Sequence, residues 1–331
     1  MNITIIGAGA WGTALAISLV EHHRVTLWAR DSAQIDEMHA SHLNQRYLPD
    51  VLLPANLKLS GDIQAAMTTA KLVVIAVPIA ALRSTLQRLS LSQHSFGVVW
   101  VCKGLEAETS LLPHQVAAEV LPEKFPCGVL SGPSFAQEVA RGLPTALTLA
   151  SSDKEFARST AQALHHSNLR IYASNDVVGV EVGGAVKNVM AIASGICDGM
   201  GLGHNARAAL LTRGLAEITR LGLKLGGRSE TLGGLSGVGD LILTCIGDLS
   251  RNRQVGLLLA QQQDLSEILR RLGHVAEGVY TVREVHQLAQ KLGVAMPICA
   301  AVYRILYEHM PAAEMVTELL NRAPNLEFNG G

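Results

Sequence analysis

A glycine-rich turn near the amino terminus is the first segment whose residue types could bind a ligand. Residues 7–12 fit the pattern G-x-G-x-x-G, after an apolar segment at 3–6 and before a helical stretch at 13–20. Glycines there permit a tight strand-to-helix turn, and the free amides at the helix start face a pyrophosphate. The order predicts a dinucleotide site, with a glycine turn that binds nothing as the alternative. The residues of this pattern expected at the site are Gly7, Gly9 and Gly12, with Ala10 directly after the second glycine.

The residue after the second apolar segment bears on the choice of cofactor. NAD-specific domains usually place an acidic side chain there, which binds the 2′-hydroxyl of the adenosine ribose. In this chain the segment at 25–29 is followed by Arg30 and then Asp31. A guanidinium can bind a 2′-phosphate through charge-assisted hydrogen bonds and can stack on adenine. Arg30 therefore favours NADP, Asp31 leaves NAD open, and a solvated charge at a strand end is the third interpretation.

Lys187 has the most unusual surroundings of the ionisable residues in the second half. It lies in an apolar helical segment, 177–193, one turn after Gly183 and Gly184. An ammonium group is costly to bury, and burial lowers its pKa toward the range useful for acid–base chemistry. The glycine pair would let a flat ring or a substrate approach the helix backbone. A lysine that extends to the surface from the helix is equally consistent with these residues.

Four short polar segments are candidates for the other walls of such a cleft. Residues 102–104 (Cys-Lys-Gly) follow a predicted strand at its carboxyl end, where open α/β sheets bind ligands. Residues 131–134 (Ser-Gly-Pro-Ser) precede a helix and suit an anion or a hydroxyl, although N-capping explains them nearly as well. Residues 250–253 (Ser-Arg-Asn-Arg) open another helix and suit a phosphate, or form a solvated charge cluster. Residues 237–240 place the Asp240 carboxylate in a glycine loop.

The apolar pattern predicts two structural halves. In the first, short segments rich in Val, Ile and Leu alternate with helical segments, which is typical of strands buried on both faces of a sheet. We expect an α/β fold: a doubly wound, mostly parallel Rossmann-type sheet domain over residues 1–175, followed by an all-α domain over residues 176–331. The predicted strands span 3–6, 25–29, 72–77, 98–102, 129–130 and 146–150, and the helices of the second half span 177–200, 206–225, 251–262, 265–272, 279–292, 298–308 and 312–321.

Composition and charge narrow the classes of protein. The 331 residues are 48% hydrophobic, and 27 Lys and Arg oppose 28 Asp and Glu, so nothing indicates a nucleic-acid or membrane-surface partner. The five cysteines are widely spaced and never arranged as C-x-x-C, which indicates a reducing compartment and no metal site. The longest apolar run, 72–82, is too short for a bilayer span of roughly 20 residues, and the amino terminus is unlike a signal peptide. We expect a cytoplasmic protein without an integral membrane segment.

Seven sequence blocks occur in order along essentially the whole chain: GAGAWGTALA at 7, CKGLE at 102, SGPSFAQEVA at 131, GGAVKNV at 183, NARAALLTRGLAE at 205, GVGDLILTC at 237 and SRNR at 250. Together they make the chain resemble the bacterial NAD(P)-dependent glycerol-3-phosphate dehydrogenases. One departure is Ala10, where the family often has serine, so a hydroxyl contact to the dinucleotide is missing. The resemblance implies interconversion of sn-glycerol 3-phosphate and dihydroxyacetone phosphate by direct hydride transfer, which supplies glycerol 3-phosphate for phospholipid synthesis. The implied cofactor is NADP or NAD; Arg30 makes NADPH a candidate for the preferred reductant, and the sequence leaves the preference open.

The resemblance also implies roles for individual residues. Lys187 is the implied catalytic acid–base, a small phosphorylated molecule is the implied substrate, and a homodimer is the assembly to be tested. The implied substrate-binding residues are Lys103, Gly132, Ser134, Lys187, Asp240, Ser250, Arg251 and Asn252. The implied cofactor contacts are Trp11, Arg30, Lys103, Ala136, Arg251, Val275 and Glu277.

Two other functions are compatible with this architecture. A 3-hydroxyacid or sugar-acid dehydrogenase also joins a dinucleotide domain to a helical domain that carries a lysine. Such enzymes usually have an asparagine one helical turn after that lysine, whereas here Asn188 is adjacent and Ala191 occupies the next-turn position. The other function is that of a catalytically silent, dinucleotide-binding regulator. The presence of Lys187 together with Lys103 and Asp240 argues against it.

Overall fold

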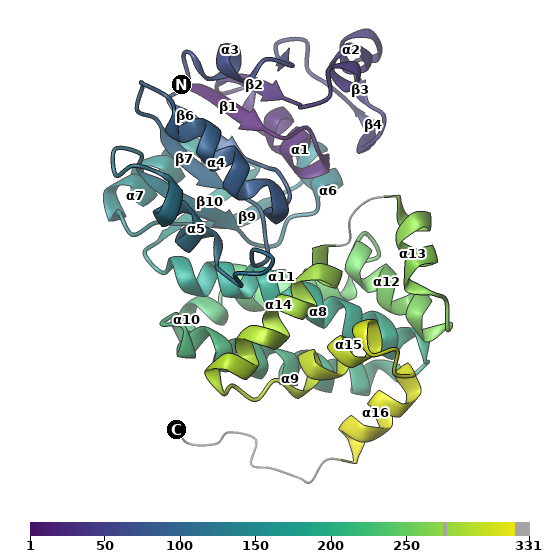
Figure 1. Ribbon diagram of the computed structural model, residues 1–331. Coiled ribbons are helices and arrows are strands. Elements are labelled where there is room, and N and C mark those ends of the chain that lie inside the picture. Colours follow the sequence, from purple (N-terminus) through teal and green to yellow (C-terminus); the bar gives the residue numbers. More distant parts are fainter. Residues whose placement is uncertain (274–276, 322–331) are drawn as a thin grey trace.

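A computed structural model describes residues 1–273 and 277–321 (Figure 1). Its first part is built on an eight-stranded sheet with the strand order β10-β9-β8-β7-β6-β1-β2-β5. Neighbouring strands are parallel except β8 and β9, which are antiparallel. The strands of this sheet are β1 (Asn2–Ile6), β2 (Arg24–Trp28), β5 (Lys58–Ser60), β6 (Leu72–Ile75), β7 (Gly97–Trp100), β8 (Cys127–Ser131), β9 (Thr145–Ala150) and β10 (Leu169–Ser174).

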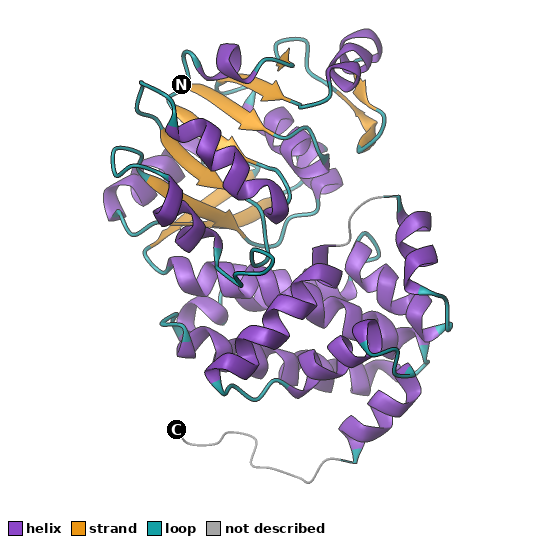
Figure 2. Ribbon diagram, viewed as in Figure 1, coloured by secondary structure: helices purple, strands orange, loops and turns teal. Residues whose placement is uncertain are grey.

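Both faces of the sheet are buried because alternate residues of its central strands enter different cores. In β6, Val73 packs in the same core as Leu86 of α4, whereas Val74 packs in the same core as Leu15 of α1. Figure 2 shows helices on both sides of the strands. The helices of this half are α1 (Ala10–Leu19), α2 (Ser32–Ser41), α3 (Ile63–Met67), the 3₁₀ turn η1 (Ile79–Ala81), α4 (Leu82–Ser90), α5 (Pro113–Val120), α6 (Ala136–Ala140) and α7 (Lys154–Leu164).

The second part of the chain is helical and is organised around α8 (Val177–Gly199). Every residue of α8 from Gly179 to Cys197 is buried. Helices α9, α11, α12 and α14 pack against it (Figure 1). The predicted fold class, a mostly parallel Rossmann-type sheet followed by a helical region, is therefore confirmed. The elements of this part are α8, α9 (Gly203–Lys224), α10 (Ser229–Leu232), the π-helical turn η2 (Leu235–Gly239), α11 (Asp240–Ile246), α12 (Arg251–Ala260), α13 (Leu265–Leu272), α14 (Glu277–Leu292), α15 (Pro297–Tyr307) and α16 (Ala312–Leu320).

Helix α8 is also long and apolar enough to cross a membrane, judged by length and composition alone. The bent helix pair Ser229–Ile246 and Arg251–Ala260 passes the same test when it is taken as one span. However, 89% of the apolar window of α8 is buried inside the protein. A helix that other helices cover on all sides is apolar all round because it forms the core, so its hydropathy needs no lipid to explain it.

A buried carboxylate fastens α8 to the sheet. Glu181 accepts hydrogen bonds at Oε1 from the indole Nε1 of Trp100, 2.8 Å away, and from the backbone amide of His114, 3.0 Å away. Its Oε2 pairs with Nδ1 of His114 at 2.5 Å. Burial raises the pKa of Glu181, and the hydrogen bonds from His114 and Trp100 oppose that rise. Because Trp100 ends β7, this contact sets where α8 crosses the carboxyl end of the sheet.

Two local features differ from the sequence-based expectations. Residues 43–52 form a separate hairpin of β3 (Leu43–Asn44) and β4 (Leu48–Leu52), which is mostly exposed and therefore lacks the apolar alternation that would have predicted it. The expectation that Asp240 lies in a glycine loop is wrong, since Asp240 is the first residue of α11, directly after η2. The glycines there serve packing: a Cβ at Gly237 would overlap the backbone carbonyl of Leu232.

Helices α8 and α12 approach so closely that glycine is required on both. A Cβ at Gly256 of α12 would overlap the carbonyl oxygen of Ile192, and a Cβ at Gly195 of α8 would overlap the carbonyl oxygen of Arg253. The backbones of the two helices are therefore in direct contact. This contact sets how closely α12 lies against α8.

We predict that Gly256→Ala destabilises the protein by about 1–3 kcal/mol, the usual cost of forcing a methyl group into a packed interior. The matched control is Gly61→Ala, because a Cβ at Gly61 would meet only Ser32 Cβ, 3.9 Å away. Urea unfolding followed by circular dichroism measures both variants. The Gly256 variant should unfold at lower urea and the Gly61 variant close to the unmodified protein. Equal midpoints for all three proteins would contradict the packing argument.

Candidate active site

Two lysines and one aspartate from three separate elements meet in the interior of the protein. Asp240 is 1% exposed and Lys187, in the middle of α8, is 6% exposed. Lys103, in the loop after β7, donates from Nζ to Oδ2 of Asp240 at 2.6 Å. Lys187 Nζ donates to the other oxygen, Oδ1, of the same carboxylate. One buried carboxylate therefore holds two ammonium groups, one on each oxygen.

Burial controls the protonation of this cluster. Desolvation is the main cause that lowers the pKa of Lys187 from 10.5 to about 7; the Asp240 carboxylate opposes this change and the nearby charge of Lys103 adds to it. An amine with such a pKa is present in both its protonated and its neutral form near neutral pH. It can therefore serve as a general acid or as a general base without a large free-energy cost for either role.

Thr244 belongs to the same cluster and was missed in the sequence analysis. Lys187 Nζ donates to Thr244 Oγ1 at 2.9 Å, and Thr244 Oγ1 donates to the backbone oxygen of Asp240 at 2.7 Å. The two residues lie one turn apart on α11, so their side chains project from the same face of that helix. The spacing from 240 to 244 was the available signal, but it has this meaning only once the segment is known to be helical.

The predicted glycine turn joins β1 to α1, and its three glycines have separable roles. Gly7 has a φ of +116°, and a Cβ there would lie 2.5 Å from the carbonyl oxygen of Ala76, just after β6. A Cβ at Gly12 would overlap the carbonyl oxygen of Gly7. In contrast, a Cβ at Gly9 would meet nothing within 4 Å, and no side chain caps the start of α1. Open space beside uncapped helix amides fits a dinucleotide pyrophosphate, and it lies where the strand order reverses between β1 and β6.

The residues near this turn differ in whether their side chains already have a hydrogen-bond partner within the protein. Arg30 is exposed two residues after the end of β2, and its guanidinium has no partner among the described residues. Asp31 caps the start of α2, where its Oδ1 accepts a hydrogen bond from the amide of Ala33 at 3.1 Å. Ala10 and Trp11 begin α1, and the Trp11 ring is half-buried against the neighbouring cores. The free charge at the edge of this site is therefore that of Arg30.

The ends of β7 and β8 lie side by side and carry the next group of predicted residues. Lys103 follows β7, and Gly132 follows β8 with a φ of +142°. Ser134 donates from Oγ to the carbonyl oxygen of Gly132 at 3.1 Å, and Ala136 begins α6. Among the described residues, Ser131 Oγ is the single buried side-chain nitrogen or oxygen without a hydrogen-bond partner.

The starts of α12 and α14 are joined by one side chain. Asn252 in the first turn of α12 accepts a hydrogen bond at Oδ1 from the amide of Gly278, 3.1 Å away. Ser250 caps α12 and accepts from the amide of Arg253 at 3.3 Å. Arg251, between these two polar residues, is exposed. The first turn of α12 thus presents one uncommitted guanidinium beside helix amides, an arrangement that suits an anion.

Glu277 connects this helix terminus with the buried cluster. It is the first residue of α14, and burial raises the pKa of its carboxyl group. The positive charges of Arg251, Lys103 and Lys187 oppose that rise, so all three cations act on the same carboxylate. The structure therefore brings residues from α8, α12, α14 and the loop after β7 into one site. Val275, also predicted to contact a cofactor, lies outside the described residues.

The space beside Gly183 and Gly184 is occupied by other parts of the protein, not left open for a ligand. A Cβ at Gly183 would lie 2.5 Å from the carbonyl oxygen of Ser236, so the π-helical turn η2 fills that place, and the expected approach of a ligand at Gly183 is wrong. A Cβ at Gly184 would lie 3.1 Å from Ser131 Oγ. These contacts let η2 and β8 close against α8. They bring Asp240, the residue after η2, within reach of Lys187.

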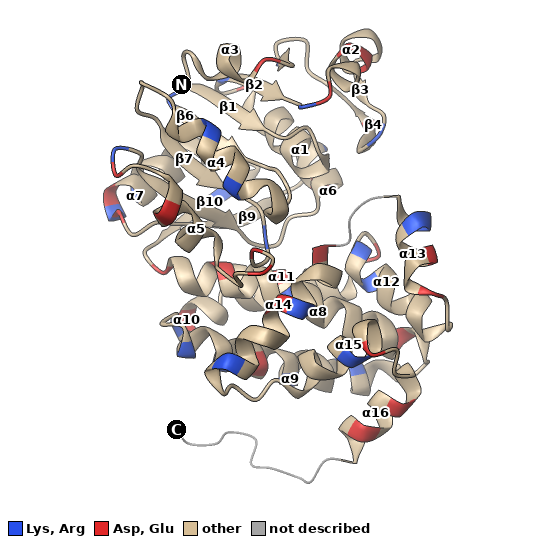
Figure 3. Cartoon of the chain, in the orientation of Figure 1, with Lys and Arg blue, Asp and Glu red and all other residues tan. Residues whose placement is uncertain are grey.

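Charges of both signs are mixed over both halves of the molecule (Figure 3). In the described part of the chain, no group of three or more His, Cys, Asp or Glu side chains is placed to hold a metal ion. The concentration of positive charge around Asp240 is therefore a local property of this site. It suits a small anionic ligand whose reacting oxygen can meet Lys187.

Comparison with known proteins places these features in a family. The family model described as NAD-dependent glycerol-3-phosphate dehydrogenase N-terminus matches residues 2–157, and its C-terminus model matches residues 176–317. The chain is 60% identical to the glycerol-3-phosphate dehydrogenase (NAD(P)+) of Thiobacillus denitrificans, covering 99% of this chain and 100% of that protein. It is 58% identical to the enzyme of that name from Nitrosomonas eutropha over 99% of both chains. The glycerol-3-phosphate dehydrogenase structure from Coxiella burnetii superposes with a TM-score of 0.93 at 44% identity, over 97% of this chain and 99% of that one.

Proposed function

The chain belongs to the NAD-dependent glycerol-3-phosphate dehydrogenase family, and we propose that its reaction, the interconversion of sn-glycerol 3-phosphate and dihydroxyacetone phosphate with NAD or NADP, takes place at Lys187. The observation that carries this proposal is the buried Asp240 carboxylate between Lys187 and Lys103. This arrangement gives the Lys187 amine a pKa of about 7. The amine can then exchange a proton with the ketone or alcohol oxygen of a small anionic substrate.

The proton transfer is the work of Lys187. In the direction of reduction its ammonium form donates a proton to the oxygen on C2 as negative charge develops there; in the direction of oxidation its neutral amine removes the hydroxyl proton. When bound, the nicotinamide supplies or accepts the hydride at that carbon. Asp240 and Thr244 hold Lys187 Nζ from one side, which fixes its direction. Lys103 lies on the other oxygen of Asp240 and lowers the pKa of Lys187 through its charge.

We propose that the first turn of α12 binds the substrate phosphate. Arg251 is exposed there in the first turn of the helix, and Asn252 and Ser250 flank it. A helix amino terminus favours a dianion, and a guanidinium can add a bidentate contact. Binding energy from this remote group can align the reacting carbon, which raises the rate of the chemical step as well as affinity. Gly132 and Ser134 are assigned to the same substrate site at the end of β8.

The cofactor is assigned to the sheet half. Gly7, Gly9, Gly12 and the uncapped start of α1 would hold the pyrophosphate, and Ala10 and Trp11 would line it. Ala136, Val275 and Glu277 complete the assignment from the family resemblance. Arg30 is free while Asp31 caps a helix, so we propose NADPH as the preferred reductant. Residues 1–175 would form the dinucleotide-binding domain and residues 176–331 the substrate domain.

In the cell the enzyme would supply glycerol 3-phosphate for phospholipid synthesis. We assign it to the cytoplasm because its five cysteines are all free, as expected in a reducing compartment, and because α8, which is long and apolar enough to span a membrane, is largely buried inside the protein. Its partners would be small molecules, since its charges are balanced at 27 basic and 28 acidic residues. A homodimer is the proposed assembly, and sedimentation equilibrium measures it directly.

We predict that Lys187→Met lowers the rate of dihydroxyacetone phosphate reduction by about 100-fold or more, the lower range for loss of a positioned acid–base. In the unmodified enzyme this rate should fall as pH rises through about 7, because Lys187 loses the proton that it must donate. The variant should lose that pH dependence and still bind reduced cofactor. The loss of NADPH or NADH absorbance measures the rate for both proteins. Lys154→Met, at an exposed position, is the control. Near-normal turnover of the Lys187 variant would reject the assignment.

The role of Arg30 leads to a prediction about cofactor choice. Arg30→Asp should weaken the use of NADPH far more than that of NADH, because the new carboxylate repels a 2′-phosphate and accepts from a 2′-hydroxyl. Steady-state kcat/KM with each reduced cofactor measures the effect. Arg158→Asp, which makes the same charge change on the exposed face of α7, is the matched control. An equal loss with both cofactors would show that Arg30 does not contact the 2′-phosphate.

The proposed phosphate site leads to a prediction about substrate selectivity. Arg251→Ala should cost roughly 1.5–3 kcal/mol in kcat/KM for dihydroxyacetone phosphate, about 10- to 150-fold, because one charge-assisted contact is lost. The kcat/KM for unphosphorylated dihydroxyacetone should change little. The comparison is made with reduced cofactor at saturation, so that a cofactor defect is not mistaken for lost phosphate binding. An equal loss of kcat/KM for both substrates would show that Arg251 does not bind the phosphate.

A further inference from the structure

We propose that Arg253 and Asp198 are positioning residues, whose ion pair holds the first turn of α12 at the correct place for the substrate phosphate. This inference rests on the proposed phosphate site at Arg251. Neither Arg253 nor Asp198 is part of the acid–base cluster or of the predicted cofactor contacts. Their proposed effect on the reaction passes through the position of Ser250, Arg251 and Asn252.

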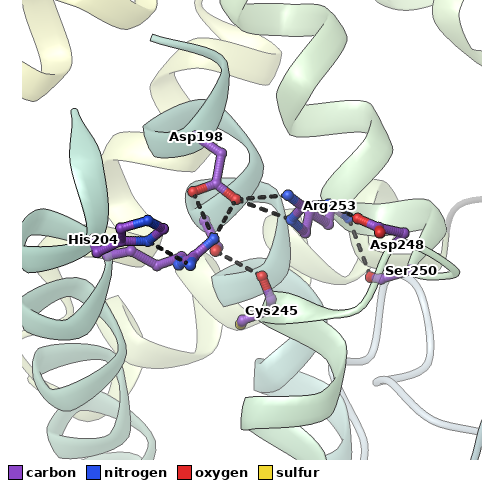
Figure 4. Close-up of polar contacts among 8 residues, drawn as sticks. Asp198, His204, Cys245, Asp248, Ser250 and Arg253 are labelled. Atoms are coloured by element: carbon purple, nitrogen blue, oxygen red, sulfur yellow. Dashed lines mark hydrogen bonds and ion pairs between the residues drawn. The ribbon is translucent and has the colours of Figure 1, made fainter. Parts of the chain in front are cut away.

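The ion pair has a well-defined geometry. The Arg253 guanidinium donates from Nε at 3.0 Å and from Nη2 at 2.8 Å to the same oxygen, Oδ2, of Asp198 (Figure 4). Its third nitrogen, Nη1, lies 2.9 Å from Oδ1 of Asp248. The Asp248 side chain is 96% exposed, whereas those of Arg253 and Asp198 are 12% and 15% exposed. The contact with Asp198 is therefore little screened by solvent and contributes most, while the contact with Asp248 contributes little.

The same residue is built into the cap of α12. The backbone amide of Arg253 donates to Ser250 Oγ, so the residue is held through its backbone as well as its side chain. Arg251 and Arg253 are two positions apart and therefore point in different directions from the helix. Arg251 is exposed and has no side-chain partner among the described residues, whereas Arg253 is turned inward to Asp198. The two arginines thus have different tasks: one is free for a ligand and the other fixes the turn.

Asp198 connects this turn to the helix that carries Lys187. It lies next to the last residue of α8, and Lys187 is eleven residues earlier on the same helix, about 16 Å away along its axis. Oδ1 and Oδ2 of Asp198 each accept from Nη1 of Arg207 at 3.2 Å, and Nη2 of Arg207 lies 2.9 Å from Nδ1 of His204 (Figure 4). Asp198 is thus held between two guanidinium groups, one from α9 and one from α12.

A fixed distance between the two ends of a substrate site has a kinetic consequence. If the phosphate is held at the start of α12, the reacting carbon reaches Lys187 only when α12 and α8 keep their relative position. A displacement of about 1 Å can cost on the order of 100-fold in rate. The glycine contact near Gly256 keeps the helices close, but it does not stop α12 from sliding or rotating along α8. The directional bonds between Arg253 and Asp198 supply that restraint.

The test compares two arginines that bind the same carboxylate. Arg253→Gln should lower kcat/KM for dihydroxyacetone phosphate by on the order of 10- to 100-fold, with a higher KM and a lower kcat, and leave dihydroxyacetone nearly unchanged at saturating NADPH. Arg207→Gln removes the other partner of Asp198 and leaves the residues of α12 unaltered. We expect kcat/KM for both substrates to stay nearly the same in this variant. Arg253→Lys keeps one charged donor for Asp198 and should recover part of the lost rate. If the glutamine variant does not fold, Arg253→Lys and Asp198→Asn provide the same comparison.

The outcomes separate the two proposals. A selective loss in Arg253→Gln, absent from Arg207→Gln, supports the positioning role. Equal losses on both substrates, or the same loss in both arginine variants, would overturn it and leave a structural ion pair. If Arg251→Ala is selective for the phosphorylated substrate and Arg253→Gln is not, the phosphate site stands and the positioning role falls. If Arg251→Ala is not selective, the phosphate site itself is wrong and the positioning role falls with it.

Discussion

The site depends on one electrostatic constraint, the burial of the Asp240 carboxylate between two ammonium groups. A lone carboxylate at that depth would be costly, and so would either lysine, because burial penalises every charged form. Together the three groups satisfy one another, yet the two cations share one anion, so Lys187 remains easy to deprotonate. Its pKa is lowered to about 7 mainly by burial, which outweighs the attraction of Asp240, and the nearby charge of Lys103 adds to the lowering. The same three groups therefore stabilise one another and leave Lys187 suited to the proton transfer that we propose for it.

This constraint requires α8 to be held at several points along its length. Glu181 joins one part of the helix to Trp100 and His114 of the sheet half, and Asp198 joins the other end to Arg253 of α12. Lys187 lies between these two fastenings, where Asp240 and Thr244 meet it from α11. An apolar helix in a close-packed interior cannot bend freely. The helix is therefore a rigid connection between the sheet, α12 and Lys187.

Glycine controls how closely the elements around α8 approach one another. At Gly183, Gly195 and Gly256 a Cβ would meet a backbone carbonyl of a neighbouring element, so these glycines bring backbones together. Gly9 is different, because space there is open and faces an uncapped helix start. Close contact without side chains is what allows η2, α11 and α12 to surround α8, while the glycine turn of the sheet half remains available to a ligand.

The order of apolar segments and the glycine pattern were sufficient to predict the two-part fold, because burial on both faces of the sheet leaves a local pattern in the residues. The family blocks indicated which polar residues to assign to the candidate site. Several matters were settled only by the tertiary structure. Asp240 and Thr244 face Lys187 because η2 and α11 form a continuous helical turn, whereas the local glycines had indicated a loop. Arg251 and Arg253 are alike in sequence, yet one is exposed and the other pairs with Asp198, 55 residues away in the chain. Such pairings depend on how helices cross, and helix crossing is decided by packing between distant segments.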